Sequence, residues 1–401
     1  MDFAFSPRVV ELREQLWDFM NTHVLPAEER YFAEFSAATI PHHIPPVMEE
    51  LKAEARLRGL WNLFLPDERF GAGLTNLEYA PLAEITGHSL IAPEAINCSA
   101  PDTGNMEVLA LFGSPEQQET WLKPLLAGEI RSCVAMTEPD VASSDPTNIS
   151  TRIEHNGDEL IITGRKWWTS GAAHPMARVS LLMGLSDREA EPHRRHSFVL
   201  VPMDAVGVRV VRQLQVFGYD DPGSHCEVMF DEVRVPAANL IGERGAAFAI
   251  AQARLGPGRI HHCMRVIGTA ERALALMCER ARTRTAFGKL LAEQGVVQQA
   301  IARSRVELEQ VRLLCHKAAW LMDTQGTKGA RAEIAAIKVA APQVACDVVD
   351  RAIQVHGGAG MSNDLPLARM YAWSRALRIL DGPDEVHLQS IARHELRKSA
   401  G

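Results

Sequence analysis

One helical seam near the C-terminus constrains the fold of this chain more than any other feature. Within residues 297–322, apolar and small side chains recur at alternating spacings of four and three residues. That spacing lines them up on one face of a helix, where a second helix must cover them. The members of the seam are Val297, Ile301, Ser304, Leu308, Val311, Cys315, Ala318 and Met322. We therefore expect the C-terminal part of the chain to form a long helical bundle.

The pattern of apolar and polar residues changes twice along the chain. Residues 1–130 show helical periodicity interrupted by Pro and Gly, and residues 244–401 return to it. Residues 131–243 instead contain short β-rich runs separated by turn residues, which is typical of strands. The sequence therefore predicts an α+β protein with an N-terminal helical domain, a middle β-barrel or sandwich, and a C-terminal four-helix bundle.

Composition and charge exclude several classes of function. The chain has 401 residues, of which 46% are hydrophobic and 23% charged, as in ordinary globular proteins. Its net charge of -8 gives no general attraction to nucleic acid or to an anionic membrane surface. No stretch approaches the roughly 20 apolar residues that cross a bilayer. We expect a small-molecule ligand, no nucleic-acid partner and no membrane insertion.

The cysteines and the N-terminus indicate a compartment. The seven cysteines are odd in number, scattered, and without a Cys-x-x-Cys or Cys/His cluster, which argues against a disulfide framework or a zinc site. Residues 1–20 contain acidic side chains and no continuous apolar run, unlike a secretory signal or a transit peptide. The sequence therefore predicts a reducing compartment, by default the cytoplasm, and no metal.

The segment CVAMTEPDVASSDPTNIST (133–151) lies where the helical texture gives way to strands. On local chemistry alone, its Thr, Ser and Asp side chains are best explained as a turn with capping groups. Small hydroxyl residues on a tight loop can also bring backbone N–H groups up to an anionic cofactor group. The sequence leaves both interpretations open.

The segment GRKWWTSG (164–171) also has two interpretations. Strand alternation places Trp167 and Thr169 on one face and Trp168 on the other. The simpler interpretation is a strand whose aromatic side chains pack in the core and at an interface. Alternatively, Trp167 covers a flat aromatic cofactor and the hydroxyl of Thr169 donates to one of its ring nitrogens.

The segment RILDGPDEVHLQ (378–389) concentrates three carboxylates around a Gly-Pro. Asp381 followed by Pro383 and Asp384 is a good helix N-terminus, with acidic groups near the positive end of the helix dipole. Local chemistry therefore favours Asp381 as a helix cap.

Five motifs in a fixed order change the balance between these interpretations. The chain resembles the acyl-CoA dehydrogenase family from about Pro7 to Leu396 through AMTEPDVASSD, GRKWWTSG, RTAFGKLL, QVHGGAG and LDGPDE. The first of these, with LGPGRIHHCMR and ILDGPDEVH, is most similar to the branch that in animals is attached to a kinase-like domain. The resemblance implies FAD as cofactor.

The resemblance implies two sets of FAD contacts. Met136 and Thr137 match residues on the pyrimidine side of the flavin, and Ser144 matches a hydroxyl beside the pyrophosphate. Trp167 and Thr169 match residues beside the isoalloxazine ring.

The second set matches residues that reach the adenosine diphosphate part of FAD from a neighbouring subunit, which implies a homodimer or homotetramer. A guanidinium suits a pyrophosphate because it donates in a planar fork. Without the resemblance, the glycines of this set would be a plain helix C-cap. Its members are Arg284, Phe287, Gln354, Gly357 and Gly358.

The resemblance also makes Asp381 the base that removes the substrate α-proton. Most relatives have glutamate here, and aspartate is shorter by one methylene, about 1.5 Å. Relatives without this base carry a glutamate at the position of Gly258, where no carboxylate is available here. Arg259 matches an arginine beside the base, whose charge would keep the carboxylate ionised.

Three departures from the family pattern affect ligand contacts. Pro383 and Glu385 stand where many relatives have Thr and Gln on FAD, although Glu385 can accept a ribose hydroxyl. Gly256 replaces an acidic residue that often contacts the pantetheine arm, so CoA must be held differently.

The resemblance implies oxidation of an acyl-CoA, with a long, branched or 4-substituted chain, to the trans-2-enoyl-CoA. Electrons would pass to an electron-transferring flavoprotein. A nitroalkane-oxidase-like flavin oxidase using the same aspartate is an alternative with the same fold. A non-catalytic scaffold acting through protein contacts is another, and the 297–322 seam is compatible with it.

Overall fold

The computed structural model describes residues 4–38, 43–220 and 225–398. The chain forms two compact units, each assembled from segments that are distant in sequence. Unit 1 comprises Met1–Pro26, Leu74–Pro93 and Arg259–Gly401, and unit 2 comprises Ala27–Gly73 and Glu94–Gly258. The predicted α+β class, with helices before and after a middle β region, is confirmed. The domain boundaries at residues 130 and 243 stay predictions.

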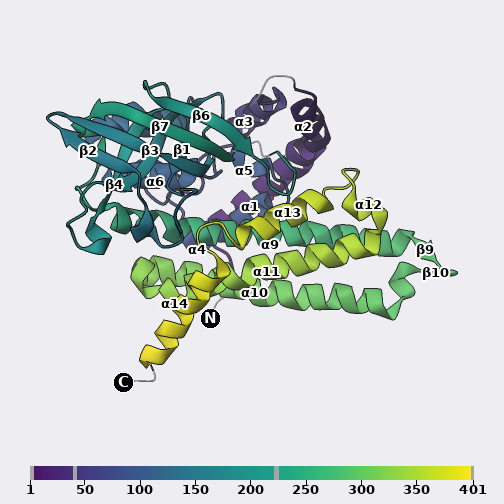
Figure 1. Ribbon diagram of the computed structural model, residues 1–401. Helices are drawn as coiled ribbons and strands as arrows, with labels where there is room; N and C mark the ends of the chain where they lie inside the picture. The colour runs from purple at the N-terminus through teal and green to yellow at the C-terminus, as the bar shows by residue number, and fades with distance from the viewer. Residues whose placement is uncertain (1–3, 39–42, 221–224, 399–401) are drawn as a thin grey trace. The chain divides into compact units, whose positions relative to one another are not determined.

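Unit 1 is helical, and its long helices lie side by side (Figure 1). Helix α10 packs on α11 and α4, and α11 packs on α13 and α14. The helices within this unit are α1 (Pro7–Phe19), α4 (Asn76–Thr86), α10 (Gly295–Gly329), α11 (Arg331–His356), α12 (Gly358–Met361), α13 (Leu367–Leu377) and α14 (Asp384–Lys398). Helices α2 (Leu25–Ala37), α5 (Ala92–Ala95) and α9 (Ala247–Thr283) contain residues of both units.

The seam predicted over residues 297–322 is confirmed as the buried face of α10. Six of its members are buried: Val297, Ser304, Leu308, Val311, Cys315 and Ala318. Ile301 and Met322 are half-buried. The seam therefore holds α10 in its bundle, as the spacing requires.

Helices α4 and α9 approach each other closely because glycine stands at the crossing. A Cβ on Gly87 would lie 1.9 Å from the carbonyl oxygen of Arg265, and one on Gly268 would lie 1.9 Å from that of Glu84. The hydroxyl of Thr269 on α9 donates to the carbonyl of Gly87 at 2.8 Å. Any larger residue at either glycine would push the helices apart.

Unit 2 contains an eight-stranded sheet in the order β6-β7-β3-β1-β4-β5-β8, with β2 paired to β3 and β4. Strands β1 and β2 both lie between β3 and β4, at opposite ends, and β1 runs parallel to β4. Buried apolar side chains from β1 to β7 form one core cluster. The strands are β1 (Arg131–Ala135), β2 (Arg152–Asn156), β3 (Glu159–Ser170), β4 (Ala177–Leu185), β5 (His196–Pro202), β6 (Val208–Leu214), β7 (His225–Pro236) and β8 (Leu240–Ile241).

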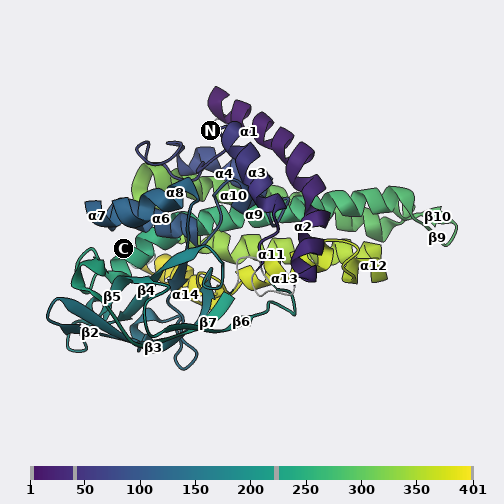
Figure 2. The same ribbon diagram turned by 90° about the horizontal axis from the view of Figure 1, so that it is seen from above.

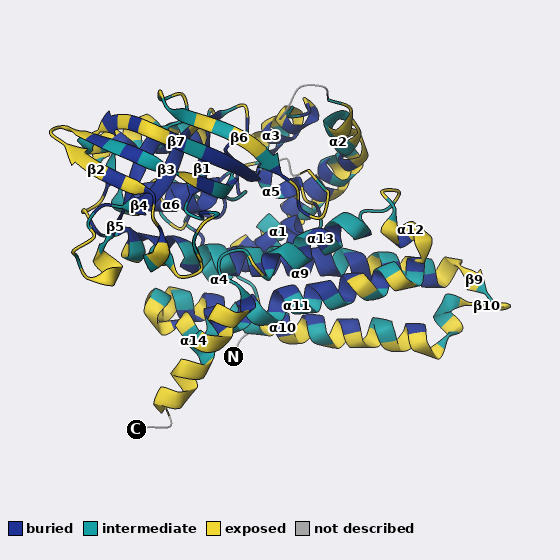
Figure 3. Ribbon diagram, in the orientation of Figure 1, coloured by how far each residue is buried: buried dark blue, intermediate teal, exposed yellow. Residues whose placement is uncertain are grey.

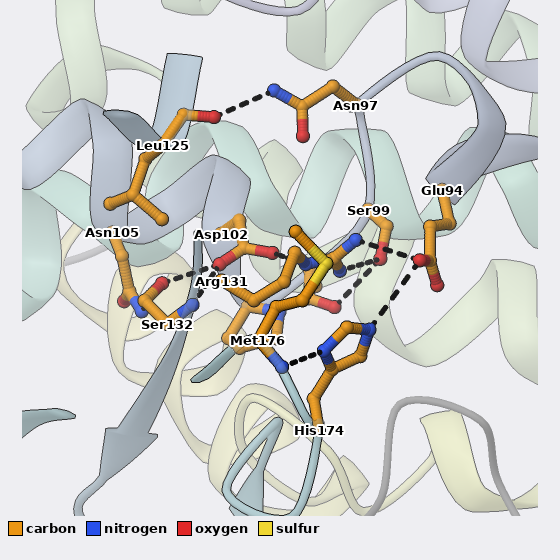
Figure 4. Close-up of polar contacts among 12 residues, drawn as sticks. Glu94, Asn97, Ser99, Asp102, Asn105, Leu125, Arg131, Ser132, His174 and Met176 are labelled. Atoms are coloured by element: carbon orange, nitrogen blue, oxygen red, sulfur yellow. Dashed lines mark hydrogen bonds and ion pairs between the residues drawn. The ribbon is translucent and has the colours of Figure 1, made fainter. Parts of the chain in front are cut away.

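Unit 2 contains a cluster of buried charged side chains, most of which Figure 4 shows. Arg131 lies between two carboxylates, with Nη1 3.1 Å from Oε1 of Glu94 and Nε paired with Oδ2 of Asp102. Lys52 Nζ lies 3.0 Å from the same Glu94 oxygen, and His174 Nε2 lies 3.7 Å from it. The helices of this unit are α3 (Val47–Leu57), α6 (Asp102–Phe112), α7 (Pro115–Gln117) and α8 (Lys123–Ala127).

Within the described residues, no helix combines the length and apolar composition needed to span a membrane. All seven cysteines are free thiols.

Candidate active site

The loop after β1, which carries Met136 and Thr137, is anchored by a buried ion pair. Lys166 Nζ donates to Oε1 of Glu138 and to the carbonyl of Met136, both at 2.8 Å. Burial lowers the pKa of Lys166 to about 8. Burial would raise the pKa of Glu138, but Lys166 holds it at about 2, so both groups are ionised at neutral pH. Because Trp167 N also donates to the carbonyl of Thr137 at 3.0 Å, the loop is fixed against β3.

The predicted alternation along GRKWWTSG is interrupted by a bulge. Trp168 has a φ of 50°, and the register between β3 and β7 shifts between Lys166 and Thr169. The rings of Trp167 and Trp168 have centroids 6.3 Å apart, so they lie next to each other. Opposite faces for the two tryptophans were therefore a wrong expectation, because the extra residue of a bulge resets the pleat.

Two polar atoms beside this bulge are buried and make no hydrogen bond with any described residue. They are Nε1 of Trp167 and Oγ1 of Thr169. Burying an unsatisfied polar group costs about 1–3 kcal/mol, so such atoms indicate a partner that is not among the described residues. Ser144 lies on an exposed turn of the loop that begins at Met136.

Asp381 occupies a turn between α13 and α14 with an unusual backbone. Its φ is 55° and that of Gly382 is 102°, so two consecutive residues adopt left-handed geometry. Helix α14 begins at Asp384, which makes Pro383 the residue directly before it. Asp381 therefore does not stand at the N-cap position, and the interpretation as a helix cap is wrong. Glu385, in the first turn of α14, is exposed.

Two donors from different helices hold the main-chain oxygen of Asp381. Arg259 Nε on α9 donates to it at 3.0 Å, and His387 Nε2 on α14 contacts it at 3.3 Å. Burial, with the nearby cations, lowers the pKa of His387 to about 4, so its imidazole is neutral at pH 7. The structure thus places Arg259 beside Asp381, but on its carbonyl oxygen.

The carboxylate of Asp381 faces a different residue. His262 Nε2, also on α9, lies 3.7 Å from Oδ2 of Asp381, and the two side chains are 28% and 24% exposed. The site therefore combines a fixed backbone with a carboxylate that solvent can reach.

Lys338 on α11 stabilises the same turn from below the surface. Its side chain is fully buried, and Nζ donates to the carbonyl oxygens of Leu377 at 2.5 Å and Leu380 at 2.7 Å. Burial lowers the pKa of Lys338. An ammonium placed here satisfies two carbonyls at the end of α13 and fixes the path of the chain into Asp381.

We expect Lys338→Met to lower the free energy of unfolding by about 1–3 kcal/mol, because one buried and one partly buried carbonyl lose their donor. Backbone amides of residues 378–384 should also exchange with solvent faster. Both effects are measurable by denaturation and hydrogen exchange. Lys317→Met is the matched control, since Lys317 is 56% exposed and pairs with Glu333 at the surface. Equal effects of the two substitutions would contradict this role of Lys338.

The residues expected to contact the FAD of a neighbouring subunit lie on elements at one end of unit 1 (Figure 2). Arg284 and Phe287 belong to the hairpin of β9 (Thr285–Ala286) and β10 (Lys289–Leu290) that follows α9, while Gln354, Gly357 and Gly358 lie where α11 meets α12. All five are exposed, and Phe287 is 101% exposed. Figure 3 shows exposed residues along the hairpin of β9 and β10. Their exposure leaves all five residues accessible to a ligand or a second subunit.

Comparison with known proteins identifies the family. The chain matches the N-terminal, middle and C-terminal domains of acyl-CoA dehydrogenases over residues 6–129, 133–233 and 245–396. It belongs to the acyl-CoA dehydrogenase family. The predicted family resemblance is confirmed, and members are FAD-dependent oxidoreductases, as this chain is.

Individual relatives agree. The Mycobacterium tuberculosis protein named "Probable acyl-CoA dehydrogenase FadE2" is 60% identical over 99% of this chain and 98% of its own length. Acyl-CoA dehydrogenase family member 11 of Rattus norvegicus is 52% identical over 99% of this chain, which spans only 52% of the rat protein. A solved structure from Mycobacterium abscessus that carries the same family name has a TM-score of 0.96, with 52% identity, covering 99% of this chain and 100% of that one.

The residues present fit the cofactor of this acyl-CoA dehydrogenase family member. Nε1 of Trp167 and Oγ1 of Thr169 are buried and unsatisfied, so they can donate hydrogen bonds to a ligand. The edge of a flavin ring, rich in nitrogen and oxygen, can accept such hydrogen bonds. The predicted cofactor, FAD, is confirmed at the level of the family.

Sequence reasoning assigned no role to Glu138, Lys166, His262 or Lys338. His262 had a usable signal, because it follows Arg259 by three residues and so lies on the same side of α9. Lys338 had none, since it stands in an apolar helix far from Asp381 in sequence.

Proposed function

We propose that the chain oxidises an acyl-CoA thioester to the trans-2-enoyl-CoA, with Asp381 as the base that removes the α-proton. Support comes from the turn that carries Asp381: its main-chain oxygen is bound by Arg259 and His387, while its carboxylate stays partly exposed. Such an arrangement fixes the backbone of the base through two contacts that do not use its carboxylate.

The remaining residues have assigned tasks in this proposal. Bound FAD supplies the acceptor for the β-hydride. Arg259 attracts Asp381 electrostatically, and its Nε holds the main-chain oxygen of that residue. Met136, Thr137, Ser144, Trp167 and Thr169 hold the cofactor in unit 2.

A second subunit completes the proposal. Arg284, Phe287, Gln354, Gly357 and Gly358 reach the adenosine diphosphate of its FAD, in a homodimer or homotetramer, and Glu385 accepts a ribose hydroxyl. The oxidised acyl chain is long, branched or 4-substituted, and an electron-transferring flavoprotein takes the electrons.

Anaerobic titration of the flavin-loaded protein with acyl-CoAs of different length and substitution tests this function. Loss of the flavin absorption band on adding one of them is the expected result. Reduction only by nitroalkanes, followed by rapid reoxidation in air, would favour the nitroalkane-oxidase-like alternative. A colourless protein that does not take up FAD would favour a scaffold.

A further inference from the structure

Two consecutive histidines on α9 face different surroundings. His261 is 1% exposed, and its ring packs edge-on against Tyr79 with centroids 4.8 Å apart. Burial holds the pKa of His261 well below its ordinary value. His262 is 28% exposed and directs Nε2 toward the carboxylate of Asp381. One imidazole is therefore part of the core, and the other connects Asp381 with solvent.

Several other ionisable groups around Asp381 contact the backbone or each other. Arg259 and His387 contact the carbonyl of Asp381, and Lys338 binds two further carbonyls of the turn. Asp384 pairs with Arg378 at 2.7 Å. Ionisable groups on α9, α11 and α14 that act electrostatically on Arg259, His261, Lys338 or His387 include Arg259, His262, Cys263, Arg265, Arg331, Lys338 and Asp384.

A base that has taken a proton must lose it before it can act again. Asp381 and the Nε2 of His262 lie 3.7 Å apart, which is ion-pair range and slightly beyond a direct hydrogen bond. A small side-chain rotation or one bridging water closes this gap. Imidazole is suited to accept and release a proton near neutral pH.

We propose that His262 is the proton acceptor that returns Asp381 to its carboxylate form after each turnover. This rests on the proposed function, in which Asp381 is the α-proton base. The Cα–H bond breaks and its proton goes to Asp381, while its electron pair forms the Cα=Cβ bond. The β-hydrogen leaves with its electron pair as hydride to the flavin, which is reduced. The proton then passes from Asp381 to Nε2 of His262 and on to solvent.

The proposal is tested by following the α-hydrogen separately from the flavin. An acyl-CoA analogue with sulfur in place of the β-methylene can lose its α-proton but has no β-hydride to give. The flavin-loaded protein is incubated with this analogue in D2O, and deuterium entering the α-carbon is measured by mass spectrometry. Without an exit for the proton, Asp381 returns it to the same carbon, and no deuterium enters.

We expect His262→Gln to lower deuterium incorporation, relative to the rate of flavin reduction by a true substrate in one turnover, by about 100-fold. In His262→Ala, added imidazole should restore incorporation, because free imidazole can enter the space and carry the proton. A purely structural role would give no such rescue.

The outcomes separate the two proposals. If His262→Gln incorporates deuterium as the wild type does, His262 does not carry the proton, and Asp381 remains the base. If incorporation and flavin reduction fall equally, His262 positions Asp381, and the relay is wrong. If Asp381→Asn still incorporates deuterium, the proposed function itself is wrong.

Discussion

Replacing Asp381 with asparagine is expected to slow flavin reduction by an acyl-CoA by about 10²- to 10⁴-fold, the usual contribution of a positioned base. Asparagine keeps the size of the side chain and tolerates the positive φ of 55° at this residue, but it cannot accept the α-proton. The turn should survive, because Arg259 and His387 bind the main-chain oxygen of Asp381 and not its side chain. FAD content should therefore be unchanged, and stopped-flow absorbance measures the rate.

Asp381→Glu is the matched control for this prediction. It introduces the glutamate that the family resemblance implies at this position and keeps a carboxylate, with an arm about 1.5 Å longer. We expect it to retain reduction while changing which acyl chains are accepted, because the α-carbon must sit farther from the turn. Unaltered reduction in Asp381→Asn, with FAD bound in equal amount, would exclude Asp381 as the base.

The fold was largely predictable because its patterns are local. The 4-3-4-3 spacing identified the face of α10 that Leu308, Val311 and Cys315 bury. The change to β-rich runs located the sheet. The bulge at Trp168 was not predictable, because its backbone geometry depends on how β3 pairs with β7. No residue type in the segment indicates it.

The candidate site was predictable only where a family motif marked it. Local chemistry predicted that Asp381 caps a helix. Helix α14 begins only at Asp384, three residues later, so Asp381 is not its N-cap. Lys338 lies 39 and 42 positions from the carbonyls that it binds, and Lys166 lies 28 from Glu138. Buried polar pairs of this kind have no periodicity, so only the folded chain brings their members together.

Replacing Arg131 with methionine should have the largest effect on stability. Arg131 is 5% exposed and pairs with the carboxylates of Glu94 and Asp102, both also buried (Figure 4). Breaking a buried ion pair by removing one partner typically costs about 3–5 kcal/mol, because a charge remains buried without its counter-ion. Lys52, 3.0 Å from Glu94, compensates that carboxylate only in part. Chemical denaturation at neutral pH measures the loss.

Arg234→Met is the matched control, because Arg234 lies on β7 and its pair with Glu159 at 3.2 Å is about half exposed on both sides. Exposed pairs contribute about 0–1 kcal/mol, so a similar loss in both variants would contradict the assignment to buried charge.

The pH dependence distinguishes lost charge pairing from lost packing. Burial would raise the pKa of Glu94, but Arg131, His174 and Lys52 together hold it well below its ordinary value of 4.5. A depressed carboxyl pKa contributes stability that is present above the unfolded-state value and is lost as pH falls through the folded-state value. The wild type should therefore lose stability steeply below about pH 4.5. Without Arg131 the pKa of Glu94 lies closer to its unfolded value, so the variant should lose less over the same range, and the two curves should converge in acid. Curves that stay parallel would mean that Arg131 stabilises unit 2 through packing alone.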